Sequence, residues 1–85
     1  MYLHLGQDVV VRKREIIGIF DMDNTTVSPR TRYFLKQAEK EKRVHNVSME
    51  LPKSFVVCAP QKKKNKTKVY IAQMAPSTLR KRANG

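Results

Sequence analysis

The chain has 85 residues, of which 18 are Lys or Arg and seven are Asp or Glu, so its formal net charge is +11 and its pI is near 10.2. A chain of this length is expected to fold as one small domain, residues 1–85, with a thin core. Its one cysteine, Cys58, has no disulfide partner and no zinc-site spacing of Cys and His accompanies it, so we expect no metal, no cofactor and no covalent staple. Self-association into a homo-oligomer is the expected source of additional buried area.

The positive charge is concentrated toward the C-terminal end. Residues 54–85 carry eight Lys or Arg and no Asp or Glu, whereas residues 1–27 carry three Lys or Arg and four Asp or Glu. A segment of one sign cannot be neutralised by local ion pairs, so its natural complement is a polyanion such as DNA, RNA or an acidic membrane surface.

Targeting signals are not recognisable in the sequence. Residues 1–8 lack a basic region and an apolar core of about 7 to 15 residues, as a secretory signal would have. No apolar run reaches the roughly 18 residues of a membrane span. We expect a cytoplasmic protein that does not contact a membrane.

Three short strands are predicted in the first twenty residues, at 2–5, 9–11 and 16–20. The turn signal from Gly6 to Asp8 joins the first two, and the three together predict an antiparallel meander. Gly18, inside the third strand, indicates a bulge or a close approach of another group to the backbone.

A basic corner interrupts this pattern. Arg12, Lys13 and Arg14 are three adjacent cations between two apolar strands, and three charges in a row cannot all point into a core. The corner is therefore predicted to be exposed at the rim of the sheet, where it could hold phosphate groups.

The segment DMDNT, residues 21–25, matches the first motif of the haloacid-dehalogenase phosphatases. Asp21 would be the nucleophile and Asp23 the general acid and base at a Mg²⁺ site. That chemistry also needs further downstream residues and a doubly wound sheet, for which this chain has no room. We therefore predict no enzyme, no small-molecule substrate and a polar loop at this position.

One main helix is predicted at residues 28–43. Ser28 and Pro29 form a helix start, and Phe34 and Ala38, with Tyr33 and Leu35 beside them, form a narrow apolar stripe. The remaining charges are assigned to a solvated face, with Glu39 and Arg43 spaced for an ion pair.

The rest of the chain completes a small α+β fold. An irregular connector covers residues 45–53, a buried strand is predicted at 54–59 and a further strand at 69–74, and a short C-terminal helix with Leu79 as its anchor follows Pro76. The sheet is expected to be mostly antiparallel, with about five strands.

The two late strands form a predicted hairpin with a cationic tip, and the last helix carries a second basic triplet. The lysines of this tip and the triplet have no apolar surface to bury in a core, so we assign them to polyanion binding. The candidate DNA-binding residues are Arg12, Lys13, Arg14, Lys53, Lys62, Lys63, Lys64, Lys66, Lys68, Arg80, Lys81 and Arg82.

The whole pattern resembles the RemA/RemB family of extracellular-matrix gene regulators of spore-forming and related Gram-positive bacteria, and its RemB members most closely. The resemblance is carried by HLG at 4–6, EIIGIFD at 15–21, Ser28-Pro29 with its helix, KSFVV from Lys53 and PSTLRKR from Pro76. It implies a small α+β subunit that assembles into rings, binds double-stranded DNA, and activates matrix and osmoprotection genes from the nucleoid.

The resemblance also shows departures at the family's DNA-contacting positions. The arginine expected at the corner after the second strand is matched by Glu15, and a pair of arginines further on by Glu50 and Leu51, with Lys53 as the nearest cation. An RNA-binding or ribosome-associated basic module is the alternative function. The scarcity of aromatic residues disfavours it, because base stacking needs them.

Overall fold

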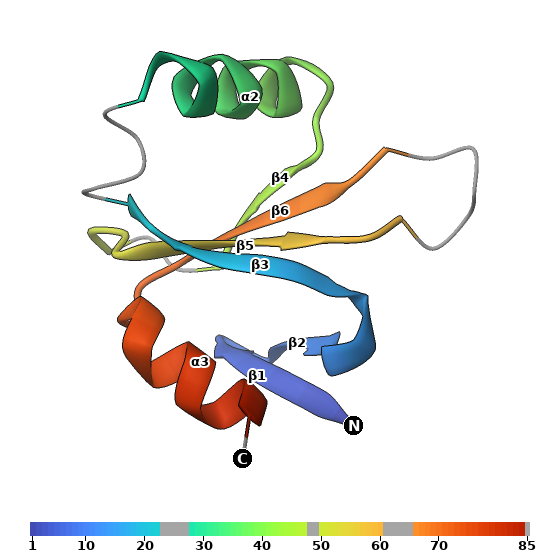
Figure 1. Ribbon diagram of the computed structural model, residues 1–85, viewed down its shortest axis with the longest axis vertical. Helices are drawn as coiled ribbons and strands as arrows, with labels where there is room; N and C mark the ends of the chain where they lie inside the picture. Colours follow the sequence, from blue (N-terminus) through green and yellow to red (C-terminus); the bar gives the residue numbers. More distant parts are fainter. Residues whose placement is uncertain (23–27, 48–49, 61–65, 85) are drawn as a thin grey trace.

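The computed structural model describes residues 1–22, 28–47, 50–60 and 66–84 (Figure 1). Its elements in chain order are β1 (Tyr2–Gly6), β2 (Val9–Arg12), the 3-10 turn η1 (Lys13–Glu15), β3 (Ile16–Asp21), α2 (Pro29–Lys40), β4 (Val44–Asn46), β5 (Ser54–Cys58), β6 (Lys68–Ala72) and α3 (Pro76–Asn84).

Three layers make up the molecule. The middle layer is a four-stranded sheet in the order β3-β5-β6-β4, in which only the β4–β6 pair is parallel. Helix α2 covers one face of this sheet, and the β1–β2 hairpin and α3 lie on the other (Figure 1). The predicted α+β class with a mostly antiparallel sheet is confirmed.

Strand β5 is the centre of the core, and all five of its residues are buried. Phe55 and Val57 point toward Ala38 of α2, while Val56 and Cys58 point toward Leu79 of α3 and the hairpin, because successive side chains of a strand alternate between faces. Burial raises the pKa of the Cys58 thiol to about 11, with a smaller contribution from Glu15. Cys58 is therefore a neutral core residue.

Several local predictions are confirmed. Gln7 and Asp8 both have positive φ in the β1–β2 turn, as a two-residue hairpin turn of type I′ requires. A Cβ on Gly18 would lie 2.5 Å from the Phe20 ring, and the β3–β5 register shifts between Ile16 and Gly18. Helix α2 starts at Pro29 directly after Ser28, although the Ser28 side chain makes no capping hydrogen bond.

The predicted meander of the first three strands is wrong. β1 pairs with β2, but β3 leaves this hairpin and pairs with β5. The turn η1 redirects the chain between the two pairings. The hairpin instead buries Leu3, Leu5 and Val11 against a face of the four-stranded sheet, so tertiary packing determines which strands pair.

The predicted extent of the main helix is also corrected. α2 ends at Lys40, and residues 44–46 form β4 where a helix end and a connector were expected. Arg43 therefore pairs with Glu41 and not with Glu39. Tyr33 does not join the apolar stripe and is 66% exposed, whereas Phe34, Leu35 and Ala38 pack on the sheet as predicted.

The lengths of the two described helices bear on the expectation that the chain has no membrane span. Neither described helix, α2 with 12 residues nor α3 with nine, is long and apolar enough to cross a membrane.

The anchoring role of Leu79 leads to a first prediction. Leu79 is fully buried and is the buried residue of α3, so Leu79→Ala should lower the free energy of unfolding by about 2 to 5 kcal/mol. Leu51→Ala is the matched control, because Leu51 is 83% exposed, and its effect should stay within about 0.5 kcal/mol. Urea denaturation followed by circular dichroism measures both. Equal effects of the two substitutions would contradict the packing of α3 described above.

Candidate functional site

Basic residues from separate parts of the sequence meet at one end of the sheet, where β3 and β6 begin and β5 ends (Figure 1). The N–H of Ala59 donates a hydrogen bond to the carbonyl of Glu15 at 2.7 Å. This bond fastens the basic corner to the end of β5, next to the chain that returns as β6. Arg12 of the corner and Lys68 at the start of β6, which are distant in sequence, are thus neighbours in space and line one surface hollow.

A series of surface hollows runs through this region, and neighbouring hollows share cationic residues. Lys13 and Arg80 line the first, and Lys13 also lines the second with Arg12 and Arg14. Arg12 and Lys68 line the third, and Lys68 continues into the fourth and largest, of about 510 Å³. We call this series the basic strip; its cationic members are Arg80, Lys13, Arg14, Arg12, Lys68, Lys66, Arg43 and Lys42.

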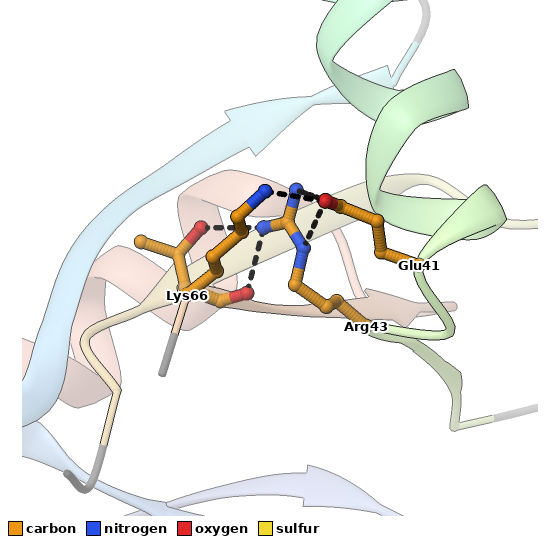
Figure 2. Close-up of polar contacts among 4 residues, drawn as sticks. Glu41, Arg43 and Lys66 are labelled. Carbon is orange, nitrogen blue, oxygen red and sulfur yellow. Dashed lines mark hydrogen bonds and ion pairs between the residues drawn. The ribbon is translucent and has the colours of Figure 1, made fainter. Parts of the chain in front are cut away.

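The largest hollow, which we call the Arg43 hollow, contains an ordered polar network (Figure 2). Arg43 donates from Nε to Glu41 Oε1 at 2.9 Å and from Nη1 to the carbonyl and the hydroxyl of Thr67 at 2.9 and 3.0 Å. The ammonium of Lys66 contacts the other oxygen of Glu41. The hydrogen bonds from Lys66 and then from Arg43 lower the pKa of the Glu41 carboxyl, which is therefore an anion at neutral pH.

A Schellman motif at the end of α2 sets the geometry of this hollow. The N–H of Arg43 donates to the carbonyl of Ala38 at 2.8 Å, and the N–H of Lys42 to that of Glu39 at 3.0 Å. Lys42 occupies the position usually held by glycine, with a φ of +59°. The motif turns the chain sharply, so that three consecutive charged residues, 41 to 43, line the hollow before β4 starts.

The predicted site residues fall into distinct groups. Lys13, Arg14 and Arg12 at the corner, Lys66 and Lys68 at the hairpin, and Arg80 of α3 all line the basic strip. Arg12 also lies 3.9 Å from Glu15 in an exposed ion pair. Lys62, Lys63 and Lys64, which were predicted at the hairpin tip, lie outside the described residues.

The remaining candidates differ in position. Lys53 is exposed just before β5, so the length of β5 separates it from the basic strip. Its backbone donates to Ala72 and accepts from Met22. On α3, Arg80, Lys81 and Arg82 are all exposed. Arg80 donates to the carbonyl of Ile19 at 2.8 Å, and Arg82 lies near Met74 Sδ.

Sequence reasoning missed Lys42, Arg43 and His45, which line the Arg43 hollow. Lys42 and Arg43 fell at the end of the longer predicted helix, whose charges were assigned to a solvated face, and His45 fell in the predicted connector 45–53. The signal that could have found them is the run EKRVH at 41–45, where cations precede a β-branched residue that can start a strand.

The part of the chain that the structure describes does not place metal-binding residues around the phosphatase-like motif. Asp21 is half-buried at the end of β3, and Asp23 lies outside the described residues. Among the described residues, no three His, Cys, Asp or Glu side chains are grouped as metal ligands would be.

The strained backbone at Lys42 leads to a second prediction. A side chain at positive φ costs roughly 1 kcal/mol, so Lys42→Gly should raise the free energy of unfolding by about 0.5 to 1 kcal/mol. Lys42→Ala keeps the Cβ and removes the same charge, so it should leave the stability close to that of the original protein. Thermal unfolding separates the two variants. If both substitutions stabilise the protein equally, the destabilising effect of Lys42 comes from its charge and not from its backbone conformation.

The chain has a relative among known proteins that aligns with 98% of its residues. No protein-family model matches it. It is 42% identical over 83 residues to extracellular matrix regulatory protein B of Bacillus subtilis (strain 168), an alignment that covers 98% of this chain and 90% of that protein. The resemblance stated from the motifs is thereby confirmed, and the chain belongs to the family of extracellular matrix regulatory protein B.

Proposed function

We propose that this protein is an extracellular-matrix regulator that binds double-stranded DNA through its basic strip, in the cytoplasm and on the nucleoid. The relative's name supports the regulatory role. The observation that carries DNA binding is the continuity of the basic strip.

The charge balance of the strip favours a polyanion. Among the described residues, eight Lys or Arg side chains line its hollows, against two carboxylates, Glu15 and Glu41. Phosphate groups repeat along a duplex at regular intervals, so a row of cations can contact several of them at once. The resulting contacts fix the position of the protein on DNA without reading the base sequence.

Two tyrosines line the strip among the described residues, Tyr2, which is 61% exposed, and Tyr70, so the strip offers a single strand few stacking surfaces and a duplex is favoured. Tyr70 lies between the two hollows that share Lys68, but it is half-buried and its ring packs against His45 at 5.7 Å. Burial raises the pKa of its hydroxyl, in keeping with a ring that is held against the protein. Unstacked bases need exposed aromatic faces.

The third prediction concerns the salt dependence of binding. Fluorescence anisotropy with a duplex of about 40 base pairs should give an affinity that falls steeply with salt, because several counterions are released. Lys68→Ala and Lys13→Ala should each weaken binding and reduce the salt slope by about 1. Lys53→Ala is the matched control, because Lys53 is exposed at the other end of β5, and it should have a smaller effect.

Two outcomes would overturn this proposal. One is an affinity that does not change with salt. The other is a preference for RNA hairpins or single strands over duplex DNA at the same salt concentration, which would favour an RNA-binding or ribosome-associated module.

We also infer that the protein works as a homo-oligomer that closes into a ring. β3 and β4 are edge strands, and several large apolar side chains are exposed in the described chain: Tyr2, Val10, Ile17, Tyr33 and Leu51. Ile17 lines an apolar hollow of about 290 Å³ with Phe20 and Phe34. A second copy that covers such surfaces would remove apolar area from water. Repetition of the basic strip around an assembly would then add avidity to weak phosphate contacts.

The fourth prediction tests this assembly. Ile17→Glu places a charge on the edge strand beside the apolar hollow, where Ile17 is 60% exposed, so the monomer should fold normally while the oligomer dissociates. Ser77→Glu, which adds the same charge at an exposed polar position of α3, is the control. Native mass spectrometry reports the subunit number, and circular dichroism reports the fold.

Binding to duplexes of increasing length completes the test. The subunit measures about 31 × 30 × 21 Å, so one copy spans at most about one helical turn of DNA. The affinity of the original protein should therefore rise with duplex length beyond about 10 base pairs, whereas that of Ile17→Glu should not. A monomeric original protein that binds short and long duplexes equally well would contradict the assembly.

A further inference from the structure

We propose that the Arg43 hollow is a phosphate-binding site, which we call the phosphate seat. In it, the phosphate replaces the carboxylate of Glu41 as the partner of Arg43 and Lys66. The inference deepens the proposed function and rests on it where the phosphate belongs to a DNA backbone. The same chemistry would also accept the phosphate of a free nucleotide, and the experiments below distinguish these two sources.

Arg43 is oriented for this role before any ligand arrives. Its Nη1 is held by two oxygens of Thr67, and its side chain is only 15% exposed. The guanidinium also lies 5.9 Å from the centre of the Phe34 ring. Its other edge, formed by Nε and Nη2, contacts Glu41 at 2.9 and 2.7 Å. This edge carries the two parallel N–H donors with which arginine binds carboxylate or phosphate.

Glu41 occupies the place that such a ligand would take. One of its oxygens accepts from Arg43 and the other contacts the ammonium of Lys66, so the carboxylate bridges two cations from separate segments of the chain (Figure 2). Glu41 is one-third exposed and Lys66 two-thirds exposed. Exposed ion pairs contribute little to stability, so an incoming anion can displace this carboxylate at small cost.

The hollow has more positive charge than Glu41 can neutralise. Lys42 and Lys68 also line it, so four cations face one carboxylate among the described lining residues. A phosphate group offers more oxygens than a carboxylate and can accept from the arginine edge and from lysines at the same time. Glu41 thus lowers the affinity of the hollow for phosphate and keeps Arg43 and Lys66 in place until a phosphate arrives.

The first test compares Glu41→Gln with Glu39→Gln by anisotropy on a duplex at about 0.1 M salt. Both variants remove one exposed carboxylate near the end of α2, but only Glu41 contacts Arg43 and Lys66. Glu41→Gln should bind DNA about three- to fivefold more tightly, whereas Glu39→Gln should change the affinity less than about twofold. Equal effects of the two variants would overturn the phosphate seat and leave DNA binding by the strip intact.

The second test uses small anions and does not depend on DNA. Pyrophosphate and a nucleoside triphosphate are titrated into the same variants, with the NMR signal of the Arg43 Nε–H as the readout. Both ligands should shift this signal at lower concentration in Glu41→Gln than in Glu39→Gln. Tighter binding of the nucleotide than of pyrophosphate would assign the seat to free nucleotides, and similar weak binding of both would assign it to backbone phosphate.

The duplex and small-anion experiments together distinguish failure of the phosphate seat from failure of the proposed DNA binding. If the original protein does not bind duplex DNA but pyrophosphate still binds Glu41→Gln more tightly, the function fails and the seat stands. If pyrophosphate shifts the Arg43 signal equally in both glutamine variants, the seat fails.

A third variant tests whether the arginine edge matters beyond its charge. Arg43→Lys in the Glu41→Gln background keeps the positive charge but lacks the paired donors, so it should lose most of the gain in affinity. Arg32→Lys in the same background is the control, because Arg32 is exposed on α2 and is not among the residues that line the Arg43 hollow. Retention of the full gain by Arg43→Lys would show that the hollow acts only through net charge and would overturn the seat.

Discussion

The burial of β5 on both faces constrains the rest of the molecule. Each of its side chains must meet either α2 or the layer formed by the hairpin and α3, and Phe55 and Phe20 stack at 5.1 Å on the α2 side. A chain of 85 residues has few apolar side chains with which to cover two faces, so nearly every buried residue serves this purpose. The charged residues are consequently excluded to the ends and edges of the sheet. Those of the basic corner and of the start of β6 gather where β5 ends, because both segments are tied to that end.

The elements that could be predicted are those with strong local signals. Pro29 after Ser28, the alternation of the first hairpin and the apolar run of β5 are such signals, and they predicted the α+β class. β4 could not be predicted because three residues have no periodicity, and its parallel pairing with β6 depends on contacts across more than 20 residues. The misassigned meander has a similar cause, since pairing partners are chosen by packing and not by proximity in the sequence.

The candidate site was predicted in its parts but not in its arrangement. Arg12, Lys13, Lys66, Lys68 and Arg80 were recognised from unbalanced charge, which is visible in sequence. That they form one strip depends on the contact between Ala59 and Glu15, which no local pattern indicates. Arg43 was hidden because its role depends on where α2 ends. That end is set by a Schellman motif with Lys42 at the glycine position, a departure from the usual sequence signal. A residue with strained backbone beside a cluster of charges is typical of functional sites.

The two arginines at opposite ends of the strip differ from its lysines in how they are held. Arg80 donates to the carbonyl of Ile19, and Arg43 to the carbonyl of Thr67, so each guanidinium uses at least one N–H in a hydrogen bond within the protein. A planar guanidinium can make such a bond and still present another edge to a ligand, whereas the ammonium of a lysine is a point charge on a flexible stem. Lys66 is two-thirds exposed and Lys68 is also exposed, so both can adjust to phosphates at different positions. The strip therefore combines two oriented cations with adaptable ones between them, which suits a ligand whose charges repeat but whose exact placement varies with sequence and bending.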